Sequence, residues 1–219
     1  MNEKILTSVD DSRPIIVSDV QIEENIGHGE YSGSVCLVSA KVKDKTISLV
    51  EKTPNKKYSF ISKISHILTT HKICKDLKIP TFPTLRTDGE NLYSTPFFEP
   101  EKFELLTANN DSKISSFLEQ QKNISFADGV CEDFENVLQN TRKKGIIIRH
   151  KDAFGFLLDR KSNKIIKIII ADFDNIGYYD DGVDRVSCFV LQSENLKHFH
   201  EAVKGIKWRY MLLPFKWPS

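Results

Sequence analysis

The sequence predicts an α+β fold, with a β-rich N-terminal part that holds one helix and a reduced, mostly helical C-terminal part. Three observations support this prediction. Runs rich in Val and Ile, broken by turn residues, fill residues 20–50. A helical pattern of apolar residues follows at 57–77, and Pro80 ends it. Beyond residue 99, helical patterns surround two short apolar strands.

The length of 219 residues predicts one large domain or two small ones. With Pro96–Pro100 as a linker, we expect one domain with two lobes. Residues 1–14 are polar and show no periodicity, so we expect a loose N-terminal arm. The N-terminal lobe is expected over 15–98 and the C-terminal lobe over 99–219.

The elements of the first lobe follow from alternation, spacing and turn residues. A turn is expected at Lys43-Asp44-Lys45, and Thr87-Asp88-Gly89-Glu90 indicates a hairpin because Asp-Gly tolerates positive φ. Pro96–Pro100 is typical of a linker between lobes. The strands expected here are Val20–Asn25, Val35–Val42, Thr46–Val50, Thr84–Arg86 and Asn91–Thr95.

The second lobe has fewer strand patterns. Phe156–Leu158 and Ile165–Ile170 are continuous apolar runs around a polar turn, as expected for strands buried on both faces. Helices are expected at Ile114–Leu118, Phe126–Lys143 and Asn195–Val203, ahead of an aromatic, Pro-containing tail over 208–219.

Composition excludes several classes of function. The 31 basic and 30 acidic residues leave a net charge of +1, so no overall field favours nucleic acid or an anionic membrane. No apolar run approaches the roughly 18 residues of a membrane span, and Met1–Lys4 leads into no signal sequence. Four dispersed cysteines are typical of a reducing compartment, which predicts a cytoplasmic protein.

Residues 145–158 carry the most specific pattern in the chain. Gly145-Ile146-Ile147 is followed by three residues, a spacer, a glycine and the apolar run at 156–158. Without a gap, this segment resembles the catalytic loop of protein kinases, G-I-I-H-R-D, four residues, Asn and a short strand. In that register His150 stands where the kinase has its catalytic Asp, and Gly155 stands where it has its Asn.

Asp172-Phe173-Asp174 follows the second apolar strand, where a kinase has D-F-G. The resemblance implies that Asp172 binds Mg²⁺, because a hard cation prefers carboxylate oxygen. Asp174 replaces the glycine, and it is either a second metal ligand or a residue that fixes the loop in one conformation.

Two segments of the first lobe resemble the nucleotide-binding parts of a kinase. Residues 27–35 are similar to its glycine-rich loop, in which backbone N–H groups approach the phosphates. Val50-Glu51-Lys52 is similar to its V-A-I-K strand, so Lys52 would reach the α- and β-phosphates of ATP. The nucleotide-binding residues that the resemblance implies are Gly27, Gly29, Tyr31, Gly33 and Lys52.

The departures from the kinase pattern concern chemistry. A kinase uses its catalytic Asp as the base and its Asn for a second Mg²⁺. Here the first becomes His150, the second becomes Gly155, and the helix at 57–77 carries no Glu to pair with Lys52. A second register makes Asp152 the base, and both residues remain candidates for it.

The resemblance therefore implies a degenerate, C-terminally truncated pseudokinase that acts by binding or regulating another protein, such as a kinase or signalling protein. ATP and Mg²⁺ are its expected ligands, and nucleic acid and membrane are not expected. One alternative is a working but atypical ATP-dependent phosphotransferase with rearranged catalytic residues. The other is an unrelated α+β interaction module, because likeness of fold does not establish function.

Overall fold

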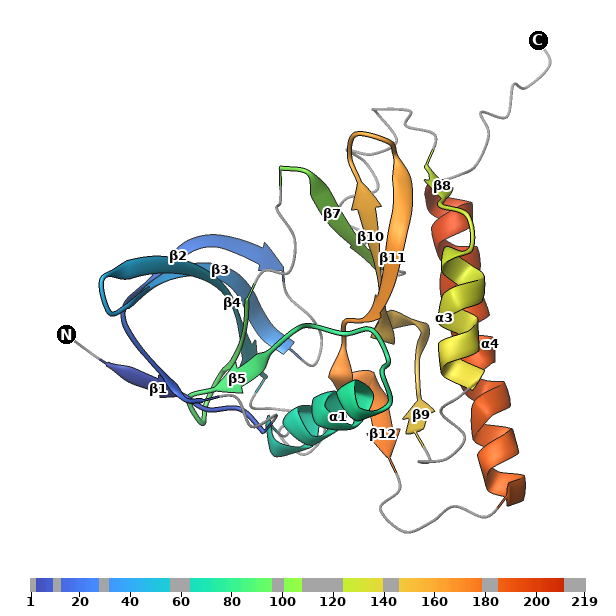
Figure 1. Ribbon diagram of the computed structural model, residues 1–219, viewed down its shortest axis with the longest axis horizontal. Helices are drawn as coiled ribbons and strands as arrows, with labels where there is room; N and C mark the ends of the chain where they lie inside the picture. The colour runs from blue at the N-terminus through green and yellow to red at the C-terminus, as the bar shows by residue number, and fades with distance from the viewer. Residues whose placement is uncertain are drawn as a thin grey trace. The chain divides into compact units, whose positions relative to one another are not determined.

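The computed structural model describes residues 3–9, 13–27, 32–55, 64–95, 101–107, 124–139, 146–178 and 185–210. The fold is α+β, as predicted, and the chain divides into two compact units. Unit 1 comprises residues 1–76 and 81–97, and unit 2 comprises 77–80 and 98–219. Figure 1 labels most of the helices and strands of both units.

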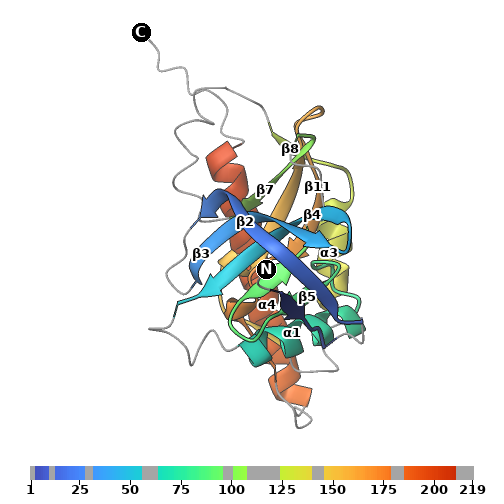
Figure 2. The ribbon, with the colours of Figure 1, turned by 90° about the vertical axis from the view of Figure 1, so that its left-hand side faces the viewer.

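Unit 1 is built on a six-stranded sheet with the order β1-β2-β3-β4-β6-β5. Strands β2, β3 and β4 are consecutive antiparallel neighbours and lie next to one another in Figure 2. The three strand predictions between residues 20 and 50 are confirmed, although each strand is longer than expected. The bounds are β1 Lys4–Leu6, β2 Ile15–Gly27, β3 Ser32–Val42, β4 Lys45–Pro54, β5 Leu85–Thr87 and β6 Leu92–Ser94.

Two turns of this sheet form where turn chemistry predicts them. Lys43 has a φ of 55° between β3 and β4, and Gly89 has a φ of 98° between β5 and β6. Glycine has no Cβ to clash in this region, so it suits the second turn at little steric cost. The inward side chains form a core that consists of Leu6, Val17, Cys36, Val38, Ala40, Leu49 and Tyr93.

The expectation of a loose arm over residues 1–14 is wrong for the part of it that forms β1. Leu6 is fully buried in the core, and Lys4–Leu6 pairs with β2 in antiparallel register. Thr7 then forms a two-way backbone bridge with Thr87 of β5, with N–O distances of 2.9 and 2.8 Å. This bridge joins the two ends of the sheet, so burial and pairing hold a segment whose sequence shows no strand pattern.

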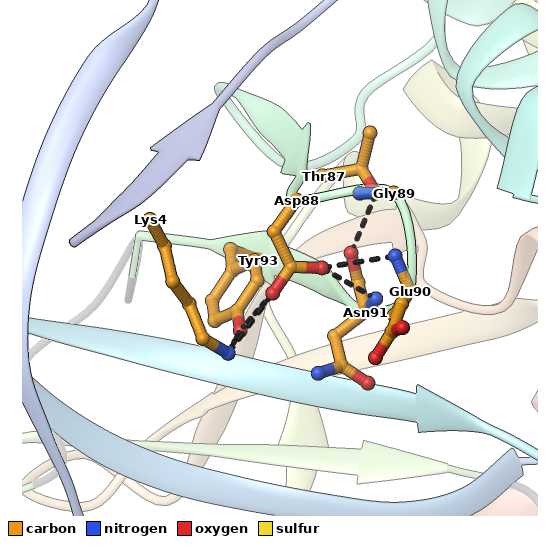
Figure 3. A network of polar contacts seen from close by, with 7 residues as sticks. All are labelled: Lys4, Thr87, Asp88, Gly89, Glu90, Asn91 and Tyr93. Carbon is orange, nitrogen blue, oxygen red and sulfur yellow. Dashed lines mark hydrogen bonds and ion pairs between the residues drawn. The ribbon is translucent and has the colours of Figure 1, made fainter. Parts of the chain in front are cut away.

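A polar network fixes this closure, and Figure 3 shows its residues. Lys4 Nζ lies 2.9 Å from both Asp88 Oδ2 and the Tyr93 hydroxyl, which itself donates to Asp88 Oδ2 at 2.9 Å. Asp88 Oδ1 accepts hydrogen bonds from the backbone N–H groups of Glu90 and Asn91, at 3.0 and 2.8 Å. Asp88 thus shapes its own turn and also anchors β1.

The protonation equilibria of this network follow from its contacts. Burial opposes charge on Asp88, but hydrogen bonds from Asn91, Lys4, Glu90 and Tyr93 outweigh burial and lower the pKa of its carboxyl. Burial likewise acts against the ammonium of Lys4, and its bonds to Tyr93 and Asp88 outweigh that effect and raise its pKa. Both charged forms are therefore favoured in the folded chain.

Helix α1, Ile64–Asp76, packs within unit 1 through a face that includes Ile67, Leu68 and Cys74. The helix predicted at 57–77 is confirmed for these residues, and residues 57–63 lie outside the described part. His71 is fully buried, and its Nε2 lies 2.8 Å from the carbonyl oxygen of Phe82. Because a carbonyl only accepts, Nε2 carries the proton.

Unit 2 contains more sheet than its sequence patterns indicate. A four-stranded sheet has the order β7-β10-β11-β8, and β9 pairs with β12 in a separate ladder. The two predicted apolar strands are confirmed as β10 and β11, whereas β7, β8, β9 and β12 were not expected. The bounds are β7 Phe103–Thr107, β8 Ser125–Phe126, β9 Ile146–Ile148, β10 Phe154–Asp159, β11 Lys164–Ile170 and β12 Ile176–Tyr178.

The long helix of unit 2 is α4, Arg185–Tyr210, which extends well beyond the predicted Asn195–Val203. Helix α3 is Val130–Gln139, so the prediction that a helix begins at Phe126 is wrong. Phe126 belongs to β8 instead, because Gly129, with a φ of 78°, turns the chain before α3 begins. The predicted helix at 114–118 and linker at 96–100 lie outside the described residues.

Helices α3 and α4 run side by side in Figure 1. Aromatic side chains join them to β10. Phe134 of α3, Phe154 of β10 and Phe199 of α4 form a mutual cluster, with ring centroids 5.2 to 5.9 Å apart. Such rings contribute large buried apolar areas and orientation-dependent contacts. No helix in the described ranges is long and apolar enough to cross a membrane.

Candidate functional site

The two segments of unit 2 that carry the predicted chemistry lie beside one another. One follows β9 and contains the single-turn 3-10 helix η4, Lys151–Ala153, and the other follows β11 and contains η5, Phe173–Asn175. The Ala153 carbonyl oxygen accepts hydrogen bonds from the N–H groups of Ala171 and Asp172, at 2.8 and 3.3 Å. Pairing of β9 with β12 closes the other side, so residues 149–153 and 171–175 form one local site.

His150 and Asp152, the two candidate bases, contact each other. His150 Nδ1 lies 2.9 Å from Asp152 Oδ2, which fits an Nδ1–H group donating to the carboxylate. Nδ1 is also 3.4 Å from the Asp152 backbone N, but that contact is too long to compete. The imidazole is 48% exposed and the carboxyl 23%, so the carboxyl is the more enclosed group.

The surroundings of Asp152 favour its neutral form. Burial is the largest effect and raises the pKa of the carboxyl, and the nearby negative charge of Asp172 adds to the rise. His150 and Lys151 oppose it without reversing it. A carboxyl with a raised pKa is better suited to accepting a proton near neutral pH than an exposed aspartate.

Asp172 is the N-cap of η5 and accepts hydrogen bonds from within that turn. Its Oδ1 accepts from the Asp174 N–H at 3.3 Å, and its Oδ2 accepts from the Asn175 side-chain Nδ2 at 3.0 Å. Asp174 is only 5% exposed. The Asp172 and Asp174 segment is therefore an ordered, self-capped turn at the end of β11.

Gly155 occupies a position that has no room for a side chain. A Cβ there would stand 2.9 Å from both Ala171 Cβ and Leu105 Cδ1, and real Cβ contacts are almost never that short. The cause is the unexpected strand β7, because Gly155 pairs with Thr107 on one side and Ile169 on the other. The sequence has Gly155 where a kinase has its Asn, and the packing around Gly155 leaves no room for an Asn side chain.

Asn195 of α4 is a positioning residue that the sequence patterns did not reveal. It is 1% exposed, and its Oδ1 accepts from the Ile148 N–H at 2.6 Å while its Nδ2 donates to the Ile146 carbonyl at 2.8 Å. The amide thus holds β9, which leads directly into His150. An amide at a buried position of a helix is the available sequence signal, because buried polar groups need partners.

The predicted nucleotide-binding residues lie in unit 1. Gly27 ends β2, while Gly29 and Tyr31 lie outside the described residues. A Cβ on Gly33 would stand 3.0 Å from the Thr53 carbonyl oxygen, so this glycine lets β3 and β4 approach closely. Lys52 is half-buried on β4 and pairs with Val35 and Leu92. Over Ile64–Asp76 the helix has one carboxylate, Asp76, at its C-terminal end.

A metal would have few side-chain ligands here. Among the described residues, no group of three or more His, Cys, Asp or Glu side chains is placed to hold a metal ion. Mg²⁺ nevertheless often binds through one or two carboxylates and completes its shell with phosphate oxygens and water. Asp172 fits that mode of binding, in which the protein supplies a minority of the ligands.

No protein-family model matches the chain, and no curated protein matches it in sequence. Among solved structures, the chain is similar to Cex1p with 10% identity and a TM-score of 0.43, covering 97% of this chain and 38% of that one. It is also similar to the BubR1 kinase domain, with 15% identity, a TM-score of 0.37 and coverage of 80% and 50%. This chain thus spans half the length of the BubR1 kinase-domain chain and 38% of the length of the Cex1p chain. Neither likeness is close enough to carry an argument.

Proposed function

We propose that the chain is a two-lobe, kinase-like protein that works by binding and has lost efficient phosphoryl transfer. The order of its elements supports this proposal. Unit 1 has three antiparallel strands, a helix and a hairpin, and unit 2 has the η4 segment, the β10–β11 hairpin and the Asp172 turn in succession. These are the parts that the sequence motifs at residues 27–52 and 145–174 require.

The packing around Gly155 is the observation that carries the loss of transfer. Phosphoryl transfer depends on positioning and on cations that neutralise the developing charge. A site that replaces the second cation's amide with a closely packed glycine, and the kinase Asp with His150, lacks two of these parts. Each such loss is severe, because there is little other chemistry for the protein to supply.

Nucleotide is the small-molecule ligand that we propose for this protein. Gly27, Gly29, Tyr31 and Gly33 would surround the phosphates, and Lys52 would supply positive charge. When bound, the nucleotide and Mg²⁺ would supply a charged, rigid element that orders the protein. The functional output would be binding or regulation of another protein, such as a kinase or signalling protein.

Thermal unfolding with ATP, measured with and without Mg²⁺, tests nucleotide binding. Ligand at about 100 times its dissociation constant stabilises the folded state by roughly 2.7 kcal/mol. A rise in unfolding temperature that Lys52→Met removes, with no transfer of labelled phosphate, is the expected result. Transfer at an ordinary kinase rate would contradict the proposal, and Lys43→Met on the exposed β3–β4 turn is the control substitution.

One observation favours a second candidate, a working atypical phosphotransferase. The carboxyl of Asp152 has a raised pKa and contacts His150. The negative charge of Asp172 contributes to that rise. In this alternative Asp152 accepts the proton of the substrate hydroxyl, and His150 orients the Asp152 carboxylate. Transfer that is lost in Asp152→Asn and retained in Asp159→Asn, at an exposed turn in the same unit, would establish this activity in place of the first.

A further inference from the structure

One ring nitrogen of His150 is held by a carboxylate, and the other has no partner. Nδ1 lies 2.9 Å from Asp152 Oδ2, and the imidazole is 48% exposed. Within the described ranges, both polar contacts of this ring are made by Nδ1, and no group pairs with Nε2. When Nδ1 carries the ring proton, Nε2 keeps an unshared electron pair. The ring therefore offers one unpaired nucleophilic atom on an exposed side chain.

Asp152 fixes this arrangement, because it stands in the single turn η4 whose N-cap is His150. Ala153 ends the turn, is fully buried, and accepts from the Ala171 N–H at 2.8 Å. Burial raises the pKa of the Asp152 carboxyl, so its carboxylate holds the Nδ1 proton more strongly. The Asp152 N–H lies 3.4 Å from Nδ1 and would need the opposite tautomer, but this contact is the longer one. A carboxylate on Nδ1–H selects the tautomer with a free Nε2.

Three other histidines in the described ranges lack this combination. His71 is fully buried, and His198 has a carboxylate near each ring nitrogen. His200 is 58% exposed, but its paired nitrogen is Nε2, which lies 3.4 Å from Glu135 Oε2. His200 therefore matches His150 in exposure and differs from it in which nitrogen is paired, so it is the natural reference residue.

The charge of this pair suits an anionic electrophile. Phosphoryl donors are anionic and repel an anionic nucleophile, whereas a neutral imidazole approaches them without that cost. A bond to phosphorus at Nε2 puts positive charge on the ring, and the Asp152 carboxylate beside Nδ1 stabilises that charge. Lys151 and Asp172 also act on the Asp152 carboxyl, with opposite charges, so neither sign dominates beside the pair.

We propose that Nε2 of His150 is a phosphoryl acceptor and that Asp152 positions its ring. The donor is a small molecule with a readily departing leaving group, an acyl phosphate or a phosphoramidate. The Nε2 electron pair forms a bond to phosphorus, and the bond from phosphorus to the leaving group breaks. The leaving group, a carboxylate or ammonia, takes that bonding pair, while the Nδ1 proton stays between the ring and Asp152. No nucleotide and no residue of unit 1 takes part, so the inference is independent of the nucleotide binding proposed above.

Phosphoramidate, added without nucleotide or metal, is the probe for this site. The full chain is incubated with it, and phosphorus NMR with mass spectrometry under alkaline conditions locates the phosphoryl group. We expect the first phosphoryl group on Nε2 of His150, lost in His150→Gln and retained in His200→Gln. An unmodified chain, or one in which His200 reacts as fast as His150, overturns the inference.

Asp152→Asn tests the positioning role. This variant should slow phosphorylation of His150 by about tenfold or more and should remove the preference for Nε2 over Nδ1, because a carboxamide no longer selects the tautomer. A purely structural role would not change the ratio of the two phosphohistidine isomers, and circular dichroism verifies that each variant is folded. Nitrogen NMR of the unmodified chain should place the ring proton of His150 on Nδ1. A proton on Nε2, or an unchanged rate and isomer ratio in Asp152→Asn, contradicts the proposal.

The outcomes separate this inference from the proposed function. A phosphoryl group on His150, in a chain whose unfolding temperature does not respond to ATP, supports the acceptor site and refutes nucleotide binding. A chain that is stabilised by ATP and is not modified by phosphoramidate refutes the acceptor site alone.

Discussion

The Asp88 turn of unit 1 and the Asp172 turn of unit 2 have similar local chemistry and different long-range partners. In both, the carboxylate accepts a backbone N–H from two residues further along the chain. Asp88 is also bound by Lys4 of β1 and Tyr93 of β6, so it links the β5–β6 turn to two strands. In unit 2, Asn195 is a buried long-range anchor that bonds the Ile148 N–H and the Ile146 carbonyl.

This difference predicts which aspartate contributes more to the stability of its unit. A carboxylate that cross-links distant strands cannot change partners without opening the sheet. The hydrogen bonds by which Asp172 caps η5 lie within one short turn, so losing them costs less than losing a cross-link between distant strands. The comparison leads to four predictions, in order of decreasing effect.

Gly155→Asn should have the largest effect and should not restore a second cation site. The side chain would be forced against Ala171 and Leu105 in the packed interior, which costs about 3 kcal/mol or more. Equilibrium urea unfolding followed by circular dichroism measures it. A variant that keeps full stability and binds a second Mn²⁺ would refute the packing argument for this site.

Asn195→Leu should destabilise unit 2 by about 2.5 kcal/mol, because it leaves the Ile148 N–H and Ile146 carbonyl buried without their partner. Hydrogen exchange of the β9 and β12 amides should report the loss locally. Glu194→Leu, one residue earlier on the exposed side of α4, is the control and should change stability by less than about 0.5 kcal/mol. Equal losses of stability in the two variants would show that Asn195 does not anchor β9.

Asp88→Ala should cost about 2 kcal/mol, twice the roughly 1 kcal/mol expected for Asp172→Ala. The first substitution removes the turn cap together with bonds to Lys4 and Tyr93, whereas the second removes a cap within η5. Urea unfolding of the two variants measures the difference directly. A larger cost at Asp172 would reverse the comparison.

Lys4→Met should have the smallest effect, about 1 kcal/mol near pH 7, since the lysine side chain is 35% exposed and solvent screens its ion pair. The folded pKa of Asp88 is lowered, so its contribution is present above the unfolded value of about 3.9 and disappears as the pH falls through the folded value. Lys4 has a raised pKa, so its contribution persists below about 10.4 and is lost at higher pH. The cost of Lys4→Met should therefore shrink in urea titrations as the pH falls through the folded pKa of Asp88, and a cost independent of pH would exclude the ion pair as its cause.

The elements that could be predicted from sequence are those with a strong local pattern. Val- and Ile-rich runs predict β2, β3, β4, β10 and β11, and Asp88-Gly89 predicts the hairpin turn. The strand β1 was missed because Lys4–Leu6 is short and lies in a polar segment, and its pairing partners are remote. Strand β7 was missed for a related reason, since Phe103–Thr107 is stabilised by pairing with β10, about 50 residues later.

The candidate site divides in the same way. Asp172 is recognisable because it directly follows an apolar strand, and His150 and Asp152 because they stand in a motif. The amides of Asn175 and Asn195 could not be predicted, because their roles depend on Asp172, Ile146 and Ile148 being brought to them by the fold. A single sequence shows the type of such a side chain but not its partner.

The closure of unit 1 by Thr7 and Thr87 also affects how this part of the chain folds. Lys4 and Tyr93 are 89 residues apart in sequence, so the ends of the sheet meet only after a long loop has closed. Contacts of such high sequence separation slow folding, and during synthesis β1 must wait until β5 and β6 have left the ribosome. We therefore expect β1, the first strand of unit 1 to be synthesised, to be among the last to pair with the sheet.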